Sequence, residues 1–310
     1  MKKLFFTILC FIVLKTAFSQ GCSDAGFCTM GAMKPNQAFH KKLNIRLRSV
    51  EISQYLGTVK FGDYIWSTTL DLTFGISDKT NLQIKLPYTA VQGVLANTQG
   101  LGDISLSLSR NLFSSEKFQI NATIGAKIPT NKADKSTSDG LPLPMYYQTS
   151  LGSYDIVAGI SLISKKWLFA AGYQQALNQA ENNFTWGAWK NGEINPISQL
   201  YPVNLKAFRG IDVMTRVERN FRFAKFFFNI GALYIHRLTN DTFISPQSKE
   251  RIEKTDTHGA SFTLLTSFGY SFSVKSAIKL SAGKQLFNYK TNIDGLSREE
   301  VIIFGFEQKF

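Results

Sequence analysis

The sequence predicts an all-β protein, a single transmembrane antiparallel up-and-down β-barrel of about 12 strands. Three observations support this prediction. Segments in which apolar and polar residues alternate recur along the 310-residue chain. Short and long connections between these segments follow one another in turn, and the last segment ends on an aromatic residue, Phe310. Repeated alternation over about ten residues is typical of the strands of transmembrane β-barrels.

The alternation gives each predicted strand one apolar face and one polar face, because successive residues of a strand point to opposite sides. Residues 118–128 show it most clearly, and in a helix the same apolar residues would surround the whole surface. We count twelve such segments. They contain residues 43–48, 69–76, 82–88, 103–109, 118–128, 154–162, 167–174, 211–218, 225–234, 262–272, 278–283 and 299–310.

The predicted connections fall into two classes by length. The tight ones are residues 77–80, 114–117, 164–166, 219–220 and 273–276. The longer ones, rich in Gly, Pro and Asn, are residues 57–63, 91–100, 130–146, 178–203, 238–257 and 288–298. Outer-membrane barrels have short periplasmic turns and long extracellular loops, and bacterial single-chain barrels have an even number of strands. We therefore expect both ends of the barrel on the periplasmic side.

The first residues have the pattern of an export signal. Lys2 and Lys3 precede an apolar run from Leu4 to Leu14, and Ala17-Phe18-Ser19 fits a cleavage site with small residues. This run is too short to cross a bilayer as a helix. We expect three parts: a signal peptide over residues 1–19, a periplasmic or lumen-inserted arm over 20–40, and the barrel over 41–310.

Two cysteines would remain after cleavage. Cys22 and Cys28 enclose five residues, and in an exported chain this spacing favours a disulfide. With Met30 and Met33 the same cysteines could instead supply four soft sulfur ligands for Cu(I). Lipid attachment at Cys22 is a further alternative, although Ser19-Gln20-Gly21 lacks the usual aliphatic residue. Our prediction is the disulfide, with no metal and no cofactor.

The net charge is +13, which raises the question of nucleic-acid binding. The basic residues are scattered singly, and no basic helix or zinc-ligand spacing accompanies them, so we predict no nucleic-acid partner. Catalysis is not indicated either. His40, His236 and His258 do not form an HExxH motif, and the chain has no Gly-x-Ser-x-Gly elbow. We predict that the protein is not an enzyme.

In a barrel the polar parity faces the lumen. The candidate lumen residues are Arg46, Arg48, Asp71, Lys85, Asp103, Lys127, Asp155, Asp212, Arg216, Glu218, Lys225 and Lys279. They allow two interpretations: a pore with a mild preference for anions, or a plugged interior in which the charges pair and only stabilise the barrel. Trp186 and Trp189, in the long connection 178–203, are candidates for a constriction at the barrel mouth, or they pack on neighbouring loops.

The closing segment has Ile302, Phe304, Phe306 and Phe310 on one parity and Glu307 and Lys309 on the other. A terminal aromatic of this kind resembles the signal that outer-membrane barrels present to the assembly machinery, so Phe310 is our candidate assembly signal. We expect this strand to pair with the first strand near Leu43 to Leu47, and we expect membrane lipid and lipopolysaccharide around the barrel.

One short motif resembles a known group of transporters. Gly100-Leu101-Gly102-Asp103 precedes a strand and follows a Leu86-Pro87-Tyr88 strand end. These residues resemble the outer-membrane transporters grouped with FadL/TodX and phenol-degradation (MetA-pathway) proteins. The resemblance implies passage of small hydrophobic compounds.

These observations predict an outer-membrane pore or transporter for passive uptake of small hydrophobic or anionic solutes. The alternative is a plugged structural or adhesion barrel that acts through its extracellular loops.

Overall fold

The computed structural model describes residues 30–34, 46–59 and 61–310. The predicted signal peptide, Cys22 and Cys28, and most of the predicted arm lie outside the described residues. Within the described part of the chain, no helix has the length and apolar content needed to cross a bilayer.

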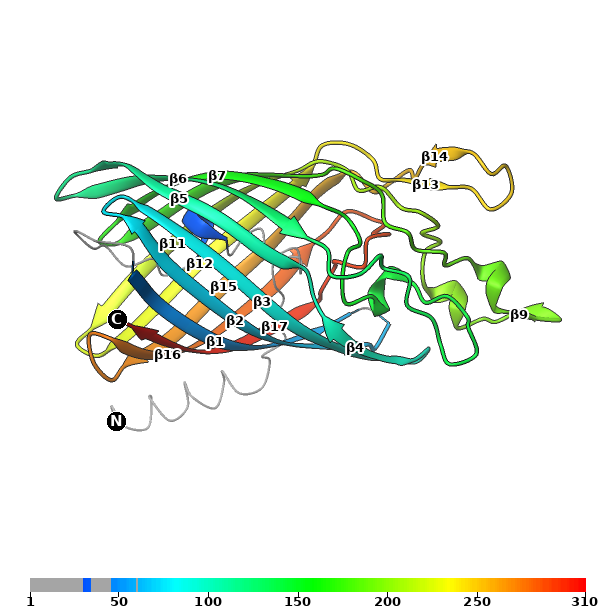
Figure 1. The fold of residues 1–310 in the computed structure, drawn as a ribbon, viewed down its shortest axis with the longest axis horizontal. Coiled ribbons are helices and arrows are strands. Elements are labelled where there is room, and N and C mark those ends of the chain that lie inside the picture. The colour runs from blue at the N-terminus through cyan, green and yellow to red at the C-terminus, as the bar shows by residue number, and fades with distance from the viewer. Residues whose placement is uncertain (1–29, 35–45, 60) are drawn as a thin grey trace, which may run out of the picture.

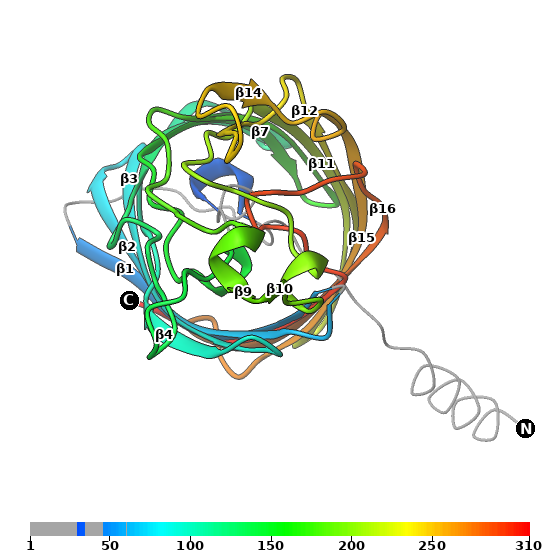
Figure 2. The ribbon, with the colours of Figure 1, turned by 90° about the vertical axis from the view of Figure 1, so that its right-hand side faces the viewer.

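The main sheet closes on itself as an antiparallel barrel, which confirms the predicted fold (Figures 1 and 2). Each strand pairs with its neighbours in the sequence, and the last strand pairs with the first. Its strands are β1 (Arg46–Thr58), β2 (Tyr64–Ser77), β3 (Thr80–Gln92), β4 (Asn97–Leu101), β5 (Ile104–Ser114), β6 (Phe118–Ile128), β7 (Asp155–Ser164), β8 (Trp167–Ala176), β11 (Asp212–Phe223), β12 (Phe226–Arg237), β15 (Gly259–Ser271), β16 (Ser276–Phe287) and β17 (Glu300–Lys309).

The short strand β4 does not change the number of barrel positions. Both β4 and β5 pair with β3, so they form one strand that is interrupted at Gly102 and Asp103. Counted in this way, the barrel of the described chain has the twelve strands that the alternation predicts.

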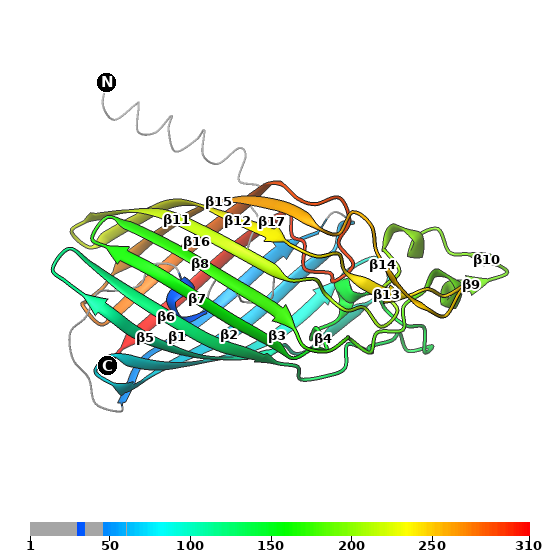
Figure 3. The same cartoon turned by 90° about the horizontal axis from the view of Figure 1, so that it is seen from above.

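The remaining elements are short and belong to the connections or to the barrel interior. They are the hairpin strands β9 (Lys190–Asn191), β10 (Glu193–Ile194), β13 (Thr242–Ile244) and β14 (Arg251–Glu253), and the 3₁₀ helices η2 (Gly31–Met33), η3 (Met145–Tyr147), η4 (Trp186–Trp189) and η5 (Ser198–Leu200). Figure 3 shows the tight turns gathered at one end of the barrel and the long connections at the other.

The barrel closes where β17 pairs with β1, but not at the residues predicted. The register runs from Ser49 opposite Lys309 to Thr58 opposite Glu300, so the partner of β17 is not the segment near Leu43 to Leu47. The alternation continues well beyond residue 48, with Ile52 outside and Glu51 inside, and a bulge between Leu47 and Ser49 shifts its phase.

One predicted turn is also wrong. Arg219 and Asn220 lie within β11, opposite Ile230 and Asn229, and the turn to β12 is at Ala224 and Lys225. The polar pair resembles a turn in the sequence, but the guanidinium of Arg219 lies 4.9 Å from the centre of the Trp167 ring, on the outer face. The ring attracts the cation, so the charged side chain of Arg219 is stabilised within the strand and no turn is needed.

The two faces of the wall differ as the alternation requires. Large apolar side chains are exposed on the outside, among them Ile52, Trp66, Ile124, Phe169 and Phe268, each between 44% and 61% accessible. Inward positions are mostly polar and buried. In a soluble protein so extensive an exposed apolar surface would be unusual.

Candidate functional site, a chamber inside the barrel

The segment 30–34 lies inside the barrel, where Figure 2 shows its short helix within the ring of strands. Met30 and Met33 are 1% and 0% exposed and pack in recesses of the inner wall. The recesses exist because Gly125 and Gly159 have no side chains. A Cβ at Gly159 would lie 2.6 Å from Met33 Sδ, and one at Gly125 would lie 2.9 Å from Met30 Cε.

Ionic contacts hold the same segment to the opposite part of the wall. Lys34 Nζ lies 2.6 Å from Glu51 and 3.1 Å from Asp71. The amide of Gly31 donates to Gln83 Oε1 at 2.8 Å, and Gln83 in turn donates to Asp71. Lys34, from the predicted arm, thereby contacts strands β1 and β2.

At the other end of the barrel, the carboxylate of Asp63 joins the long connections. The hydroxyls of Tyr147 and Tyr201 each donate to it at 2.7 Å, and the amide of Val94 donates at 3.2 Å. Burial raises the pKa of Asp63, and the two tyrosine hydrogen bonds oppose that rise. Four separate connections are therefore held by one side chain.

Trp186 and Trp189 lie in η4, which together with η5 covers the mouth in Figure 2. Trp186 Nε1 donates to the carbonyl of Tyr201, and Trp189 Nε1 donates to the carbonyl of Pro142, both at 2.8 Å. Trp186 therefore braces its own connection, and Trp189 joins that connection to the β6–β7 connection. Whether they restrict a passing solute stays a prediction.

A second buried cluster is centred on Arg237, at the end of β12. Its guanidinium donates to Asp212 at 2.9 Å, to Asp241 at 2.8 Å and to Asp294 at 2.8 Å. Nearby, Arg209 pairs with Asp155. Because these carboxylates come from β11, from the β12–β15 connection and from the β16–β17 connection, the cluster fixes the loops to the rim.

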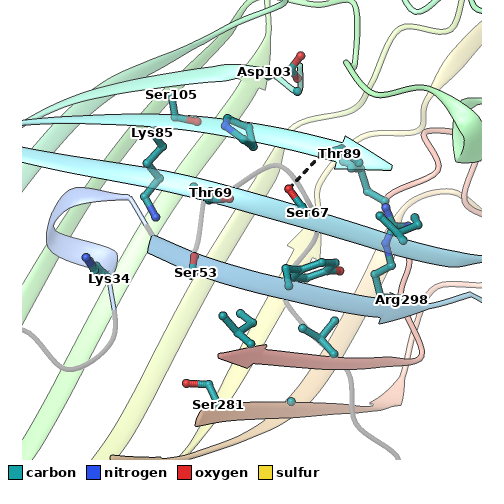
Figure 4. A pocket seen from close by; sticks show the side chains of 18 of the residues that line it. Lys34, Ser53, Ser67, Thr69, Lys85, Thr89, Asp103, Ser105, Ser281 and Arg298 are labelled. Atoms are coloured by element: carbon teal, nitrogen blue, oxygen red, sulfur yellow. Dashed lines mark hydrogen bonds between the residues drawn. The ribbon is translucent and has the colours of Figure 1, made fainter. Parts of the chain in front are cut away.

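Between these two ends lies a chamber of about 230 Å³. Lys34 bounds it on the turn side, and parts of the β6–β7 and β16–β17 connections bound it on the loop side. Figure 4 shows Lys34 and Lys85 at one end of the chamber, Arg298 at the other, and Ser281 on the wall formed by β16. The β16–β17 connection fits closely at Gly295 (φ +71°), where a Cβ would lie 2.6 Å from the backbone of Met145.

The described lining of the chamber carries six basic and four acidic residues. The basic ones are Lys34, Lys85, Lys127, Arg216, Lys279 and Arg298, and the acidic ones are Glu51, Asp103, Glu218 and Asp294. Each acidic residue contacts a cation: Glu51 contacts Lys34, Asp103 contacts Lys127 at 3.7 Å, Glu218 contacts Arg216, and Asp294 contacts Arg237. The chamber surface therefore has an excess of positive charge.

The structure places the sequence candidates in three groups. Those that line the chamber are Lys85, Asp103, Lys127, Arg216, Glu218 and Lys279. Asp71, Asp155 and Asp212 are buried in ion pairs beside it or at the rim. Arg46, Arg48 and Lys225 do not line the chamber.

The lumen prediction is wrong for Lys225, which is exposed in the turn after β11, because that strand ends later than predicted. Arg46 is exposed at the start of β1. Arg48 occupies the bulge and donates weakly to the carbonyl of Ser77 at 3.4 Å.

Sequence reasoning missed several residues of the site. Glu51 could have been predicted from the sequence, since the alternation of β1 continues past residue 48. Lys34, Asp63, Arg209 and Arg298 lie outside the strands. Nothing periodic marks such positions, so their contacts depend on how the connections fold back.

No group of three or more His, Cys, Asp or Glu residues in the described part of the chain is arranged to hold a metal ion. No family model matches the chain, and no curated protein matches it.

Solved structures do match. The COG4313 outer membrane channel from Pseudomonas putida F1 matches 89% of this chain and 99% of its own, with a TM-score of 0.59 and 10% sequence identity. The chain shares the barrel fold of that channel. The NanC porin matches 86% of this chain and 100% of its own (TM-score 0.46, 9% identity). The CymD monoaromatic hydrocarbon channel matches 95% of both chains (TM-score 0.44, 11% identity).

Identities this low establish the fold alone, and the argument rests on the first match. The barrel class that the sequence predicted is confirmed. The finer resemblance to FadL/TodX and phenol-degradation transporters stays a prediction.

Proposed function

We propose that this protein is an outer-membrane channel through which small solutes pass by diffusion. The observation that carries the proposal is the polar chamber of about 230 Å³ inside a closed barrel whose outer face is apolar. A closed barrel satisfies its backbone hydrogen bonds internally, as hydrocarbon surroundings require. The short turns then lie on the periplasmic side and the long connections outside the cell.

The size and charge of the chamber favour small solutes and anions. Pockets for drug-sized ligands have volumes of roughly 300–1,000 Å³, so this chamber suits smaller molecules. Its described lining has six basic and four acidic residues. The N-terminal signal, contact with membrane lipid and lipopolysaccharide, and recognition of the closing strand by the assembly machinery belong to the same proposal.

A second candidate function has its own support. Residues 30–34 occupy the lumen, and Asp63, Tyr147 and Tyr201 join the connections over the mouth. A barrel closed in this way could act as a structural or adhesive platform through its outer loops.

Conductance in a planar bilayer separates the two functions. We expect the purified full chain to give discrete currents that are larger for anions than for cations. Replacing the carboxylate by Asp63→Ala removes the shared acceptor of both tyrosines, so we expect larger or more frequent currents from that variant. If neither protein conducts and neither passes solutes in liposomes, the channel proposal is wrong and the platform is favoured.

A further inference from the structure

The inner wall from β12 to β1 has a regular arrangement of side chains. Because the strands are in register, inward residues line up in rows across β12, β15, β16, β17 and β1. Three consecutive rows, each read in that strand order, are Phe227-Gly269-Lys279-Gly305-Ser53, Asn229-Ser267-Ser281-Ile303-Tyr55 and Gly231-Leu265-Gly283-Val301-Gly57. Neighbouring strands are only about 4.8 Å apart, so adjacent members of a row are close.

Lys279 differs from the other lysines of the chamber lining. Its ammonium has no carboxylate within 4 Å among the described residues, whereas Lys34, Lys85 and Lys127 all have one. Its neighbours in the row on β15 and β17 are glycines, Gly269 and Gly305, which offer no side chain as a partner.

Three polar groups of the row beside Lys279 also have no hydrogen-bond partner among the described residues. Asn229 is 4% exposed, lines the chamber, and its Nδ2 donates no hydrogen bond among the described residues. The buried hydroxyls of Ser281 and Tyr55 likewise make no hydrogen bond with the described residues. Buried polar groups are normally hydrogen-bonded, so unpaired donors on the wall of a cavity indicate a place for a bound acceptor.

The third row is small and apolar. Leu265 and Val301 alternate there with glycines, and Ile303 extends the apolar surface toward Tyr55. The Tyr55 side chain lies over Gly57, where a Cβ would be 2.6 Å from its hydroxyl, and Glu218 lies over Gly231. The apolar surface that this row offers to the chamber is therefore that of Leu265 and Val301. The wall therefore combines one cation, several hydrogen-bond donors and an apolar surface.

We propose that this wall binds a small organic monocarboxylate, with the carboxylate at Lys279, Asn229 and Ser281 and the apolar body over Leu265 and Val301. The inference rests on the proposed channel function and names its substrate class. Tyr55 is placed to contact the far side of the body. Glu51 and Glu218 face the same space, and Lys34 and Arg216 already contact them. Among the described residues of this wall, Lys279 is then the cation left for the solute, which favours a solute with a single negative charge.

Direct binding of benzoate to the purified full chain in detergent tests the proposal without requiring conduction. Loss of a hydrogen-bonded charge pair weakens binding by roughly 10- to 100-fold, so we expect that loss for Lys279→Met. Lys279→Arg keeps a cation and should keep most of the affinity. Lys225→Met, in an exposed turn, is the matched control and should bind as the wild type does. Benzyl alcohol, which has the ring without the charge, should bind much more weakly.

Heat-modifiable migration on gels checks that each variant forms the barrel. If Lys279→Met does not fold, Asn229→Leu and the comparison of benzoate with benzyl alcohol give the answer. The inference is overturned if the wild type does not bind benzoate, or if the folded variants bind it equally well. Channel currents without benzoate binding would contradict the proposed binding site but support the proposed channel. Benzoate binding by a protein that never conducts would support the site and contradict the channel.

Discussion

Single side chains decide how the loop end of the barrel is held. Asp63 accepts hydrogen bonds from two tyrosines of different connections, and Arg237 contacts three carboxylates from three parts of the chain. A buried charge that loses its partners is costly, by about 3–5 kcal/mol in comparable ion pairs. These residues therefore concentrate the stability of the loop region in a few interactions.

The Arg237 cluster should make stability depend on pH. Burial raises the pKa of Asp241 to about 6, with Asp294 and Asp212 adding to the rise and Arg237 opposing it. An unfolded Asp titrates near pH ~3.9, so between pH ~4 and 6 the folded chain binds the additional proton. The resulting contribution to stability is complete below about pH 4 and is lost as pH rises through 6.

Asp241→Asn cannot titrate, and its side-chain oxygen can still accept from the Gly210 amide that Asp241 binds at 2.7 Å. We expect the difference in thermal unfolding midpoint between wild type and this variant to change between pH 4 and 7, with the wild type relatively more stable at the acidic end. Heat-modifiable gel migration measures the midpoints. A difference that is constant with pH would contradict the assignment.

Among the elements, η2 and its flanking residues Met30 and Lys34 contact the inner wall from within the barrel. Two methionines fit glycine recesses on one side, and Lys34 pairs with Glu51 and Asp71 on the other. The apolar and ionic contacts act on opposite walls, so the segment spans the interior rather than lying along one strand.

Lys34→Met should loosen this segment, because two carboxylates of the wall lose a cation. Hydrogen bonds to charged groups contribute roughly 1.5–3 kcal/mol, which sets the size of the expected loss. Hydrogen exchange of the peptide that contains residues 30–34 should become about tenfold faster or more. Lys117→Met, in the exposed β5–β6 turn, is the control. Equal exchange in both variants would show that the ion pairs of Lys34 do not hold the segment.

At the scale of the whole molecule, closure depends on the pairing of β1 with β17. Phe310 follows the last strand, its amide donates to the carbonyl of Arg48 at 2.8 Å, and its side chain is 64% exposed. A charge near the end of a lipid-facing strand costs only about 0–1 kcal/mol, so stability alone gives this residue little importance.

Deletion of Phe310, or Phe310→Asp, should nevertheless reduce insertion while export continues, if the assembly machinery recognises the terminal aromatic. The amount of barrel in the outer-membrane fraction measures this. Val274→Asp, at a fully exposed turn position, is the control and should insert normally. Normal levels of the Phe310 variants would remove the proposed role as an assembly signal.

The sequence alone determined the barrel. Lipid-facing and inward residues must alternate along every strand, so the apolar residues recur at every second position and the pattern can be read directly from the sequence. It also placed Lys85, Asp103, Lys127, Arg216, Glu218 and Lys279 on the inward parity, where they line the chamber. The alternation predicted the ends of strands less well. Arg219 and Asn220 were predicted as a turn although they lie within β11, and the first strand was predicted to end before β1 does.

Only the tertiary structure decided which inward charges pair with one another among the described residues. Lys279 and Lys85 have the same pattern in the sequence, yet Lys85 lies 3.4 Å from Asp71 and Lys279 has glycines beside it on both neighbouring strands. Pairing depends on register between strands far apart in the chain, and the chamber depends on connections that fold back without any period. Those contacts are non-local, so no stretch of sequence contains them.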